Sequence, residues 1–378
     1  MCQAIEPTES QYSDAKERYE TIGAFLSEEG SPLHPYRPVI YPQGSMRIRA
    51  AIKPDNGKEY DVDLVCEFKV TPHSDPKIVK RLVWDRFRNS DRYRDKVIER
   101  NRCVQIQYAG EFHMDVMPCV PGLPHWLKFG SVWVPDQSMN EWKPSHPKGF
   151  AAFVETASLL NPVQSVAFCN AIENRAADVQ PLPSEQSFTK PALIRIIQIL
   201  KRHRDEYFRQ DHGCAPISII LTTLATHSYS EAVKRLSFES AYDLLLEVVT
   251  GMPKFINVIQ KTATYSVPNP THSEENFAEK WNHNPLLPKA FFDWHRRVSA
   301  DFKALAEQET VGLDAVGKTF ENSFGVQAAN RALRGLSSAV RSNVKAGNVG
   351  ITATGLVVPA TKVYPAVAKT PPHNFHGG

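Results

Sequence analysis

Residues 41–68 read YPQGSMRIRAAIKPDNGKEYDVDLVCEF, and this stretch decides the fold of the chain. A glycine-serine pair, Gly44-Ser45, follows the short apolar run VIYP, and the acidic pattern DVDLV begins at Asp61. Residues two apart on a strand point to the same face, so we expect Asp61 and Asp63 to project side by side, about 6.6 Å apart along the strand. Two such carboxylates repel one another unless a cation lies between them, and oxygen ligands of this kind suit Mg²⁺.

A third carboxylate follows on the next predicted hairpin. Residues 102–108 alternate like a strand, and residues 111–118 return as its partner, with Asp115 amid apolar residues. The glycine-serine pair allows the backbone to approach a phosphate and offers hydroxyl and N–H donors to it. An Asp-x-Asp pattern alone does not indicate a metal site, because it is typical of a solvated sheet edge as well. With the turn and the third acid beside it, the pattern favours a two-metal phosphoryl-transfer site.

Composition limits the class of protein. The chain has 378 residues, 42% of them hydrophobic and 22% charged, which is typical of a globular protein with two lobes. A net charge of +3 does not predict a stable nucleic-acid partner. We expect a cytoplasmic protein with no membrane association, because no run approaches 18 apolar residues and no signal peptide is evident.

The predicted elements divide the chain into strands first and helices afterwards. Thr8 and Gln11 form a capping box for a first helix, and Asp75-Pro76 begins a second. Residues 121–149 show no clear period, and we expect a surface connection with one short strand at 131–134. Further helices are predicted at 189–209, 216–228, 240–249, 285–308 and 313–322.

This layout is α+β, with a mixed-sheet core and a helical C-terminal lobe. We expect three parts: a catalytic core with its N-terminal helix at 1–185, a helical lobe at 186–342, and a flexible tail at 343–378. The tail is low in charge and rich in Pro, Gly, Ala and Thr.

The segments QGSMRIRAAIKP, DVDLV and FHMDVMP together resemble the signature of the polymerase-β-type nucleotidyltransferases. More narrowly, the chain resembles the bacterial cGAS/DncV-like nucleotidyltransferases (CD-NTases) of CBASS anti-phage operons. Longer blocks carry this second likeness: residues 134–153, 190–205, 215–229 and 267–281. The family often has a threonine five residues after the serine, where this chain has Ala50, a departure that bears on subfamily.

The resemblance implies roles for matching positions. Asp61, Asp63 and Asp115 would hold two Mg²⁺ ions, with Mn²⁺ as a substitute, and Gly44 and Ser45 would contact the donor triphosphate. Lys201 and Ser218 match residues that bind the same phosphates. From the residues alone, Lys201 fits a solvated basic patch equally, and Ser218 fits a first-turn residue that bonds its own backbone.

The activity that the resemblance implies is a nucleotidyltransferase that joins nucleoside triphosphates, ATP among them, into a cyclic di- or trinucleotide and releases pyrophosphate. Two other hypotheses stay open. One is a tRNA-tailing or AMP-transferring enzyme of the same superfamily. The other is a catalytically silent nucleotide-binding module, against which the intact set of three aspartates argues.

The chain ends in PPHNFHGG, and this end has two interpretations. A frayed terminus is one. The other is a tail that threads a narrow channel to a conjugating enzyme, since glycine has no Cβ. CD-NTases from operons with an E1/E2-like partner resemble this second case, so Gly378 is predicted as a conjugation site.

Overall fold

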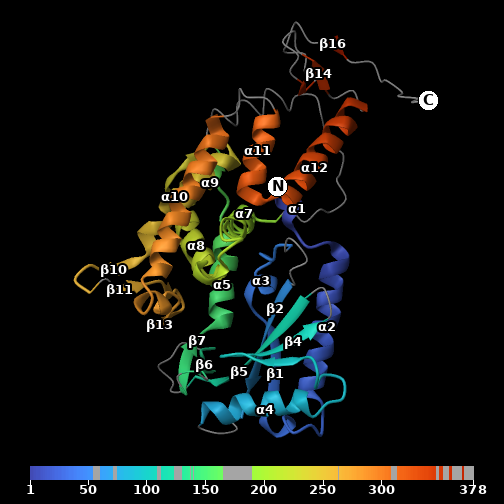
Figure 1. Ribbon diagram of the computed structural model, residues 1–378, viewed down its shortest axis with the longest axis vertical. Helices are drawn as coiled ribbons and strands as arrows, with labels where there is room; N and C mark the ends of the chain where they lie inside the picture. The colour runs from blue at the N-terminus through green and yellow to red at the C-terminus, as the bar shows by residue number, and fades with distance from the viewer. Residues whose placement is uncertain are drawn as a thin grey trace.

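The computed structural model describes residues 1–53, 60–70, 75–108, 112–122, 130–136, 138, 140–164, 190–262, 264–307, 313–345, 349–351, 357–359 and 368–369. A mixed sheet forms the N-terminal lobe, and helices stand above it (Figure 1). This arrangement confirms the predicted α+β fold.

The sheet has seven strands in the order β1-β2-β5-β4-β3, with β6 paired to β5 and β7 to β6. Its strands are β1 Pro38–Pro42, β2 Tyr60–Phe68, β3 Val97–Glu99, β4 Val104–Tyr108, β5 Phe112–Pro121, β6 Val132–Asp136 and β7 Glu141–Ser145. β2 and β5 run parallel, whereas β4 pairs with β5 as the predicted antiparallel hairpin. The parallel pair therefore lies in the middle of the sheet, where both of its strands have neighbours.

Two helices cover the sheet from below and from the side in Figure 1: α4 Pro76–Arg88 and α2 Glu9–Ser27. The predicted capping box is present, since the Thr8 hydroxyl accepts from Gln11 N and the Gln11 side chain accepts from Thr8 N. Asp75 caps α4 as predicted, accepting from Lys77 N at 2.8 Å. Apolar side chains of both helices and of the strands form one core, which includes Leu26, Val83 and Met114.

The helical lobe confirms the predicted helices and adds two. Its long helices are α5 Pro147–Ser158, α7 Ala192–Tyr207, α8 Ser218–Arg235, α9 Ala241–Gly251, α10 Leu286–Glu307, α11 Leu313–Phe324 and α12 Val326–Lys345. α8 runs seven residues beyond its predicted end. α5 and α12 were not predicted from the sequence.

The connection at 121–149 was predicted to hold one strand, but β6 and β7 form a hairpin there. Pro144 interrupts the pattern of β7, and this explains why the second strand was missed. A further hairpin, β12 Pro268–Asn269 with β13 His272–Asn276, contacts β7 from the helical lobe.

The first helix, α1 Cys2–Ile5, packs in the helical lobe although it begins the chain. Ile5 is fully buried in the core of that lobe, and its carbonyl accepts from Lys53 N at 2.6 Å. Arg331 of α12 donates through Nε to Ala4 O at 2.8 Å. Helix α1 therefore contacts both α12 and the end of the segment that follows α3.

The core of the helical lobe also takes in α5, which precedes residue 186. The predicted division at 185/186 stays a prediction, because residues 165–189 lie outside the described part of the chain. Within the predicted tail, α12 continues to Lys345 and three short strands form a sheet: β14 Val349–Ile351, β15 Val357–Pro359 and β16 Ala368–Lys369. Gly378 lies outside the described residues.

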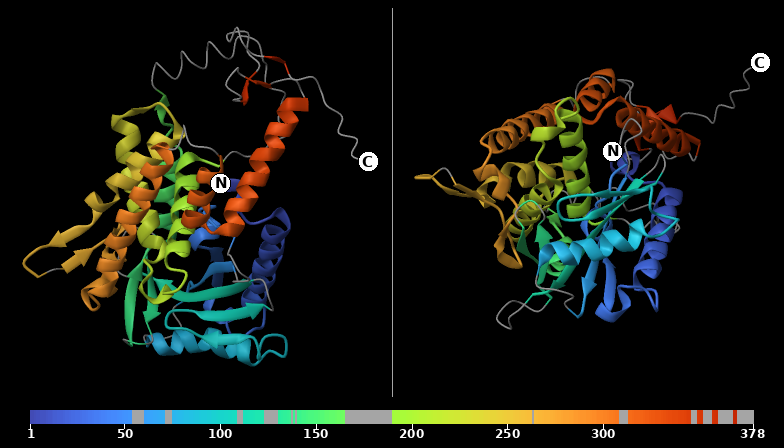
Figure 2. Two further views of the ribbon diagram at one scale, coloured as in Figure 1. Left: turned by 45° about the horizontal axis from the view of Figure 1, so that its top comes forward. Right: turned by 60° about the horizontal axis from the view of Figure 1, so that its bottom comes forward.

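Across the described helices, none has both the length and the apolar content to cross a membrane. Figure 2 gives two further views of the lobes.

Candidate active site

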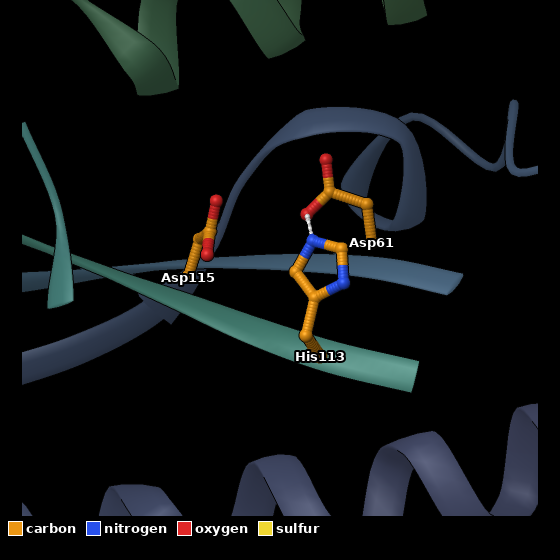
Figure 3. A group of neighbouring side chains, drawn as sticks. All are labelled: Asp61, His113 and Asp115. Atoms are coloured by element: carbon orange, nitrogen blue, oxygen red, sulfur yellow. Dashed lines mark ion pairs between the residues drawn. The ribbon is translucent and has the colours of Figure 1, made fainter. Parts of the chain in front are cut away.

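The parallel register of β2 and β5 brings the predicted acids together. Asp61 pairs with His113 and Asp63 pairs with Asp115. The potential ligand atoms of Asp61, His113 and Asp115 all lie within 4.8 Å of one another, and His113 Nε2 is 3.5 Å from Asp61 Oδ1. Figure 3 shows the two carboxylates on the same side of their strands, with the imidazole beside Asp61. His113 thus lies at the site beside the aspartates.

Asp63 lies against the glycine of the predicted phosphate turn. Gly44 begins the short helix α3 Gly44–Arg47 with φ of +62°, in the left-handed region that favours glycine. A Cβ on Gly44 would collide with the Asp63 carboxylate. Asp63 also accepts from Gln43 N through its main-chain oxygen at 3.0 Å. The glycine therefore serves to bring the turn onto the acid, in addition to any approach to phosphate.

Like charge and burial perturb these acids. Desolvation raises the pKa of Asp63 well above its ordinary value, and the charges of Asp61 and Asp115 add to the rise. The pKa of Asp61 is raised by the same two kinds of cause, but 57% of its side chain is exposed, so water screens much of the effect. A divalent cation would relieve both the repulsion and the desolvation. The donors are carboxylate oxygens, which Mg²⁺ and Mn²⁺ prefer, so the residues present fit such an ion.

A cavity of about 740 Å³ opens above the acids and joins the two lobes. Ser45, Asp61 and Asp63 line it from the sheet lobe, and Lys201 and Ser218 line it from the helical lobe. The structure thus places these five predicted site residues, with Gly44, on one cavity. Asp115 of β5 is paired with Asp63 of β2, the neighbouring parallel strand.

Lys201 is buried, with 6% of its surface exposed, so the solvated basic patch considered from the sequence is excluded. Its Nζ donates to Ala50 O at 3.1 Å. Desolvation and, next to it, the charge of Arg204 lower the pKa of Lys201 to about 8, although Asp205, Asp61 and Asp63 act in the opposite direction. Lysine has three donors, so two remain for an anion in the cavity.

Ser218 is the first residue of α8, and its hydroxyl accepts from Arg204 Nη1 at 3.0 Å. The same guanidinium bonds Asp205 Oδ1 at 2.6 Å. Arg204 was not predicted as a site residue. The signal was present, because Arg204 lies three residues after Lys201 and so faces the same side of the helix.

The far wall of the cavity was also missed. It comes from β7, β12 and β13, and Glu275 is its centre: Ser145 Oγ donates to Oε1 at 2.9 Å and Asn269 Nδ2 donates to Oε2 at 2.7 Å. Desolvation raises the pKa of Glu275. Sequence reasoning had no means to pair β7 with a strand 130 residues further along the chain.

His203, in the basic stretch of α7, has an acidic partner that the sequence around it does not identify. Its Nε2 lies 3.0 Å from Asp301 Oδ2, and Trp294 Nε1 donates to its Nδ1 at 3.1 Å. Both partners come from α10, about 90 residues away along the chain, so the pattern around His203 did not reveal them. The group packs inside the helical lobe and does not line the cavity.

Comparison with known proteins finds similarity to nucleotide synthetases. Residues 1–157 match the Second Messenger Oligonucleotide or Dinucleotide Synthetase domain. A protein of Roseivirga ehrenbergii, named a c-di-GMP synthase, is 28% identical over 362 residues, covering 95% of this chain and 91% of that protein. The cyclic dinucleotide synthase CdnG of Bradyrhizobium diazoefficiens is 24% identical over 364 residues, covering 92% and 85%.

Solved structures share the same fold. The structure of the Bradyrhizobium diazoefficiens CdnG in complex with GTP has a TM-score of 0.68 and 22% identity, covering 89% of this chain and 97% of that one. Vibrio cholerae DncV in complex with a linear intermediate has a TM-score of 0.55 and 13% identity, covering 88% and 94%. These likenesses confirm the predicted fold, a nucleotidyltransferase core with a helical lobe.

The Gly44–Asp63 contact yields a stability prediction with a matched control. Gly44→Ala is expected to displace the Asp63 carboxylate and to destabilise the protein by more than Gly30→Ala. Gly30 also has a positive φ, of +81°, but a Cβ there meets nothing within 4 Å, so it carries backbone strain alone, about 1 kcal/mol. Urea unfolding of both variants measures the difference, and equal losses would contradict the close approach.

The burial of Lys201 predicts a pH-dependent stability difference between the parent and Lys201→Met. Below about pH 8 the lysine is charged in both the folded and the unfolded chain, so the folded parent bears the full desolvation of the charge. Between about 8 and 10.5 the unfolded chain binds more protons, so the free energy of unfolding of the parent rises relative to that of the variant, by about 2–3 kcal/mol by pH 10. Urea unfolding of the metal-free proteins from pH 7 to 10 tests this, and a difference that does not change with pH would refute it.

Proposed function

We propose that the chain is a member of the cGAS/DncV-like nucleotidyltransferases and that it joins two nucleoside triphosphates into a cyclic dinucleotide. The observation that carries the proposal is the set of three aspartates on the paired strands β2 and β5, of which Asp61 and Asp63 line a cavity with basic residues on its opposite wall. The names of the two relatives support guanine nucleotides as the first substrates to test, beside ATP.

The reaction would begin when the 3′- or 2′-hydroxyl of one nucleotide attacks the α-phosphorus of another. A new P–O bond forms, the bond to the β-phosphate breaks, pyrophosphate leaves, and the hydroxyl proton passes to solvent. A second attack within the linear intermediate closes the ring and releases a second pyrophosphate. When bound, Mg²⁺ would lower the pKa of the attacking hydroxyl and neutralise charge on the leaving group.

The residues of the chain contribute position and charge. Asp61, Asp63 and Asp115 would hold the metal ions, for which the donor set fits. Ser45 offers a hydroxyl at the first turn of α3, and Lys201 offers a buried positive charge on the opposite wall. Between these two walls a triphosphate would meet donors from both sides, which orients its α-phosphate toward the acids.

The burial of charged residues at the cavity strengthens their attraction for a triphosphate. Buried charges act on a phosphate more strongly than solvated ones, because the surrounding dielectric is lower. Lys201 has a pKa of about 8 and so carries its charge at neutral pH. Arg204 supports the same wall by bonding Ser218 and Asp205, which keeps its guanidinium at the cavity edge.

The test is to incubate the purified chain with labelled ATP, GTP, CTP and UTP and to treat the products with phosphatase. With the label on the α-phosphate, free nucleotides lose it, a linear dinucleotide keeps only its internal phosphodiester label, and a cyclic dinucleotide keeps both labels and has no free end, so chromatography after phosphatase treatment separates the last two. A tailing or AMP-transferring enzyme would instead label an added RNA or protein, and a silent module would consume nothing.

Asp63→Asn is the decisive variant in that assay. It removes one ligand charge at nearly constant size, so we expect loss of detectable product. The metal-free variant should be at least as stable as the parent, because one of three repelling carboxylates is gone. Product formation at a rate near that of the parent in Mg²⁺ would exclude Asp63 from the site, and a thermal melt controls for folding.

We further propose a role in anti-phage defence and conjugation of the C-terminus by an E1/E2-like enzyme. Support comes from the resemblance to CBASS nucleotidyltransferases and from the terminal Gly-Gly pair. A structurally similar protein, Escherichia coli CdnC, has been solved in complex with a HORMA protein, which shows that a protein of this fold forms stable assemblies.

Co-expression with a conjugating enzyme encoded beside the gene tests the role of Gly378. Higher-mass adducts on a denaturing gel are expected for the parent and not for Gly378→Glu, because only a residue without a bulky side chain fits a narrow channel. Cyclic product formation should be the same for both proteins. Adducts that persist in the variant, or none with the parent, would refute the conjugation site.

A further inference from the structure

Asp115 has a hydrogen-bonding partner that its sequence pattern did not reveal. Gln105 of β4 lies directly opposite Asp115 of β5 in the antiparallel register. Its Nε2 donates to Asp115 Oδ1 at 2.9 Å. Gln105 has only 6% of its surface exposed, so this amide has little water with which to exchange the bond.

The orientation of the Gln105 amide is set by Arg100. The guanidinium donates to Gln105 Oε1 twice, from Nε at 3.1 Å and from Nη2 at 2.7 Å. Arginine carries donors only, so the amide oxygen must face it, and the amide N–H group must then face Asp115. A reversed amide would place an oxygen against a carboxylate and an NH₂ against a guanidinium.

The loop that carries Arg100 is itself held. Arg100 N donates to Cys103 O at 3.0 Å, which closes the turn before β4. From α4, the buried Lys80 Nζ donates to Arg100 O and, at 3.3 Å, to Asn101 O. Helix α4 thereby fixes the loop, and the loop holds the guanidinium against the Gln105 amide.

A carboxylate held through one oxygen has a fixed plane. The bond from Gln105 to Oδ1 restricts rotation of the Asp115 carboxylate, and it therefore also directs Oδ2. The Cys103 thiol, a weak donor, bonds the same carboxylate, and burial together with Asp115 raises the pKa of this thiol. Partners of this kind, bonded to a metal ligand and not to the metal, commonly change metal affinity by tenfold to a hundredfold.

We propose that Gln105 is a positioning residue that sets the orientation of the Asp115 carboxylate for a divalent cation, and that Arg100 sets the orientation of Gln105. The inference rests on the proposed function only in taking Asp115 as a metal ligand. It adds two residues from outside the aspartate pattern and makes the edge of the sheet at β3–β4 part of the machinery.

Binding of Mn²⁺ alone to the metal-free protein, followed by electron paramagnetic resonance, tests the proposal without turnover. Gln105→Met keeps the length of the side chain and removes the donor, so we expect Kd for Mn²⁺ to rise tenfold to a hundredfold. Arg100→Met leaves Gln105 in place but releases its amide, so we expect a smaller rise, of severalfold. Gln107→Met makes the same chemical change at an exposed position of the same strand and should bind Mn²⁺ like the parent.

Parent-like Mn²⁺ affinity in Gln105→Met would overturn the proposal, and so would an equal loss in Gln107→Met. If Gln105→Met does not fold, Arg100→Met decides, since Arg100 lies at an exposed position; unchanged affinity there would refute the orienting role. Failure of the proposed function is distinguishable, because it would appear as absence of cyclic product from a parent that still binds Mn²⁺. If the parent forms cyclic product but Gln105→Met binds Mn²⁺ like the parent, the positioning role is wrong and the proposed function stands.

Discussion

Repulsion among three carboxylates on two neighbouring parallel strands is the constraint around which this structure is arranged. In a central parallel pair, both strands are fixed by neighbours, so the acids cannot relax apart by strand movement. Desolvation and like charge raise the pKa of Asp63 in consequence. The aspartates therefore destabilise the folded state locally. Two large apolar cores, one in each lobe, stabilise the surrounding helices and strands.

The sheet lobe presents aspartates and a glycine turn to the cavity. The helical lobe presents Lys201 and Arg204 on α7, with Asp205 and Glu275 beside them. Each set is unfavourable alone, because buried like charges repel and a buried cation loses its hydration. Across a cavity of about 740 Å³ they oppose one another, and a ligand with a polyanionic group and bound cations would neutralise both. This complementarity links the fold to the proposed chemistry more directly than any single residue does.

The acids and the phosphate turn were predictable because they follow local rules: alternation on a strand, a hairpin, and a glycine before a serine. The helical lobe was predictable for the same reason wherever the apolar period was strong, as in α7 and α10. Relations that depend on distant pairing were not. The Ser145–Glu275 bond joins residues 130 apart, and the His203–Asp301 bond joins residues 98 apart. Gln105 was missed although it lies only ten residues from Asp115, because a glutamine on a strand carries no pattern of its own.

The contact between α1 and α12 has a consequence for synthesis on the ribosome. Domains generally begin to fold from the N-terminus as the chain emerges. Here the first helix docks on the helical lobe, and its Ala4 carbonyl takes its bond from Arg331, a residue made 327 positions later. The same short helix bonds Lys53, at the end of a segment that lines the cavity. The sheet can therefore assemble early, but this wall of the cavity acquires the support of Arg331 only after α12 has been made.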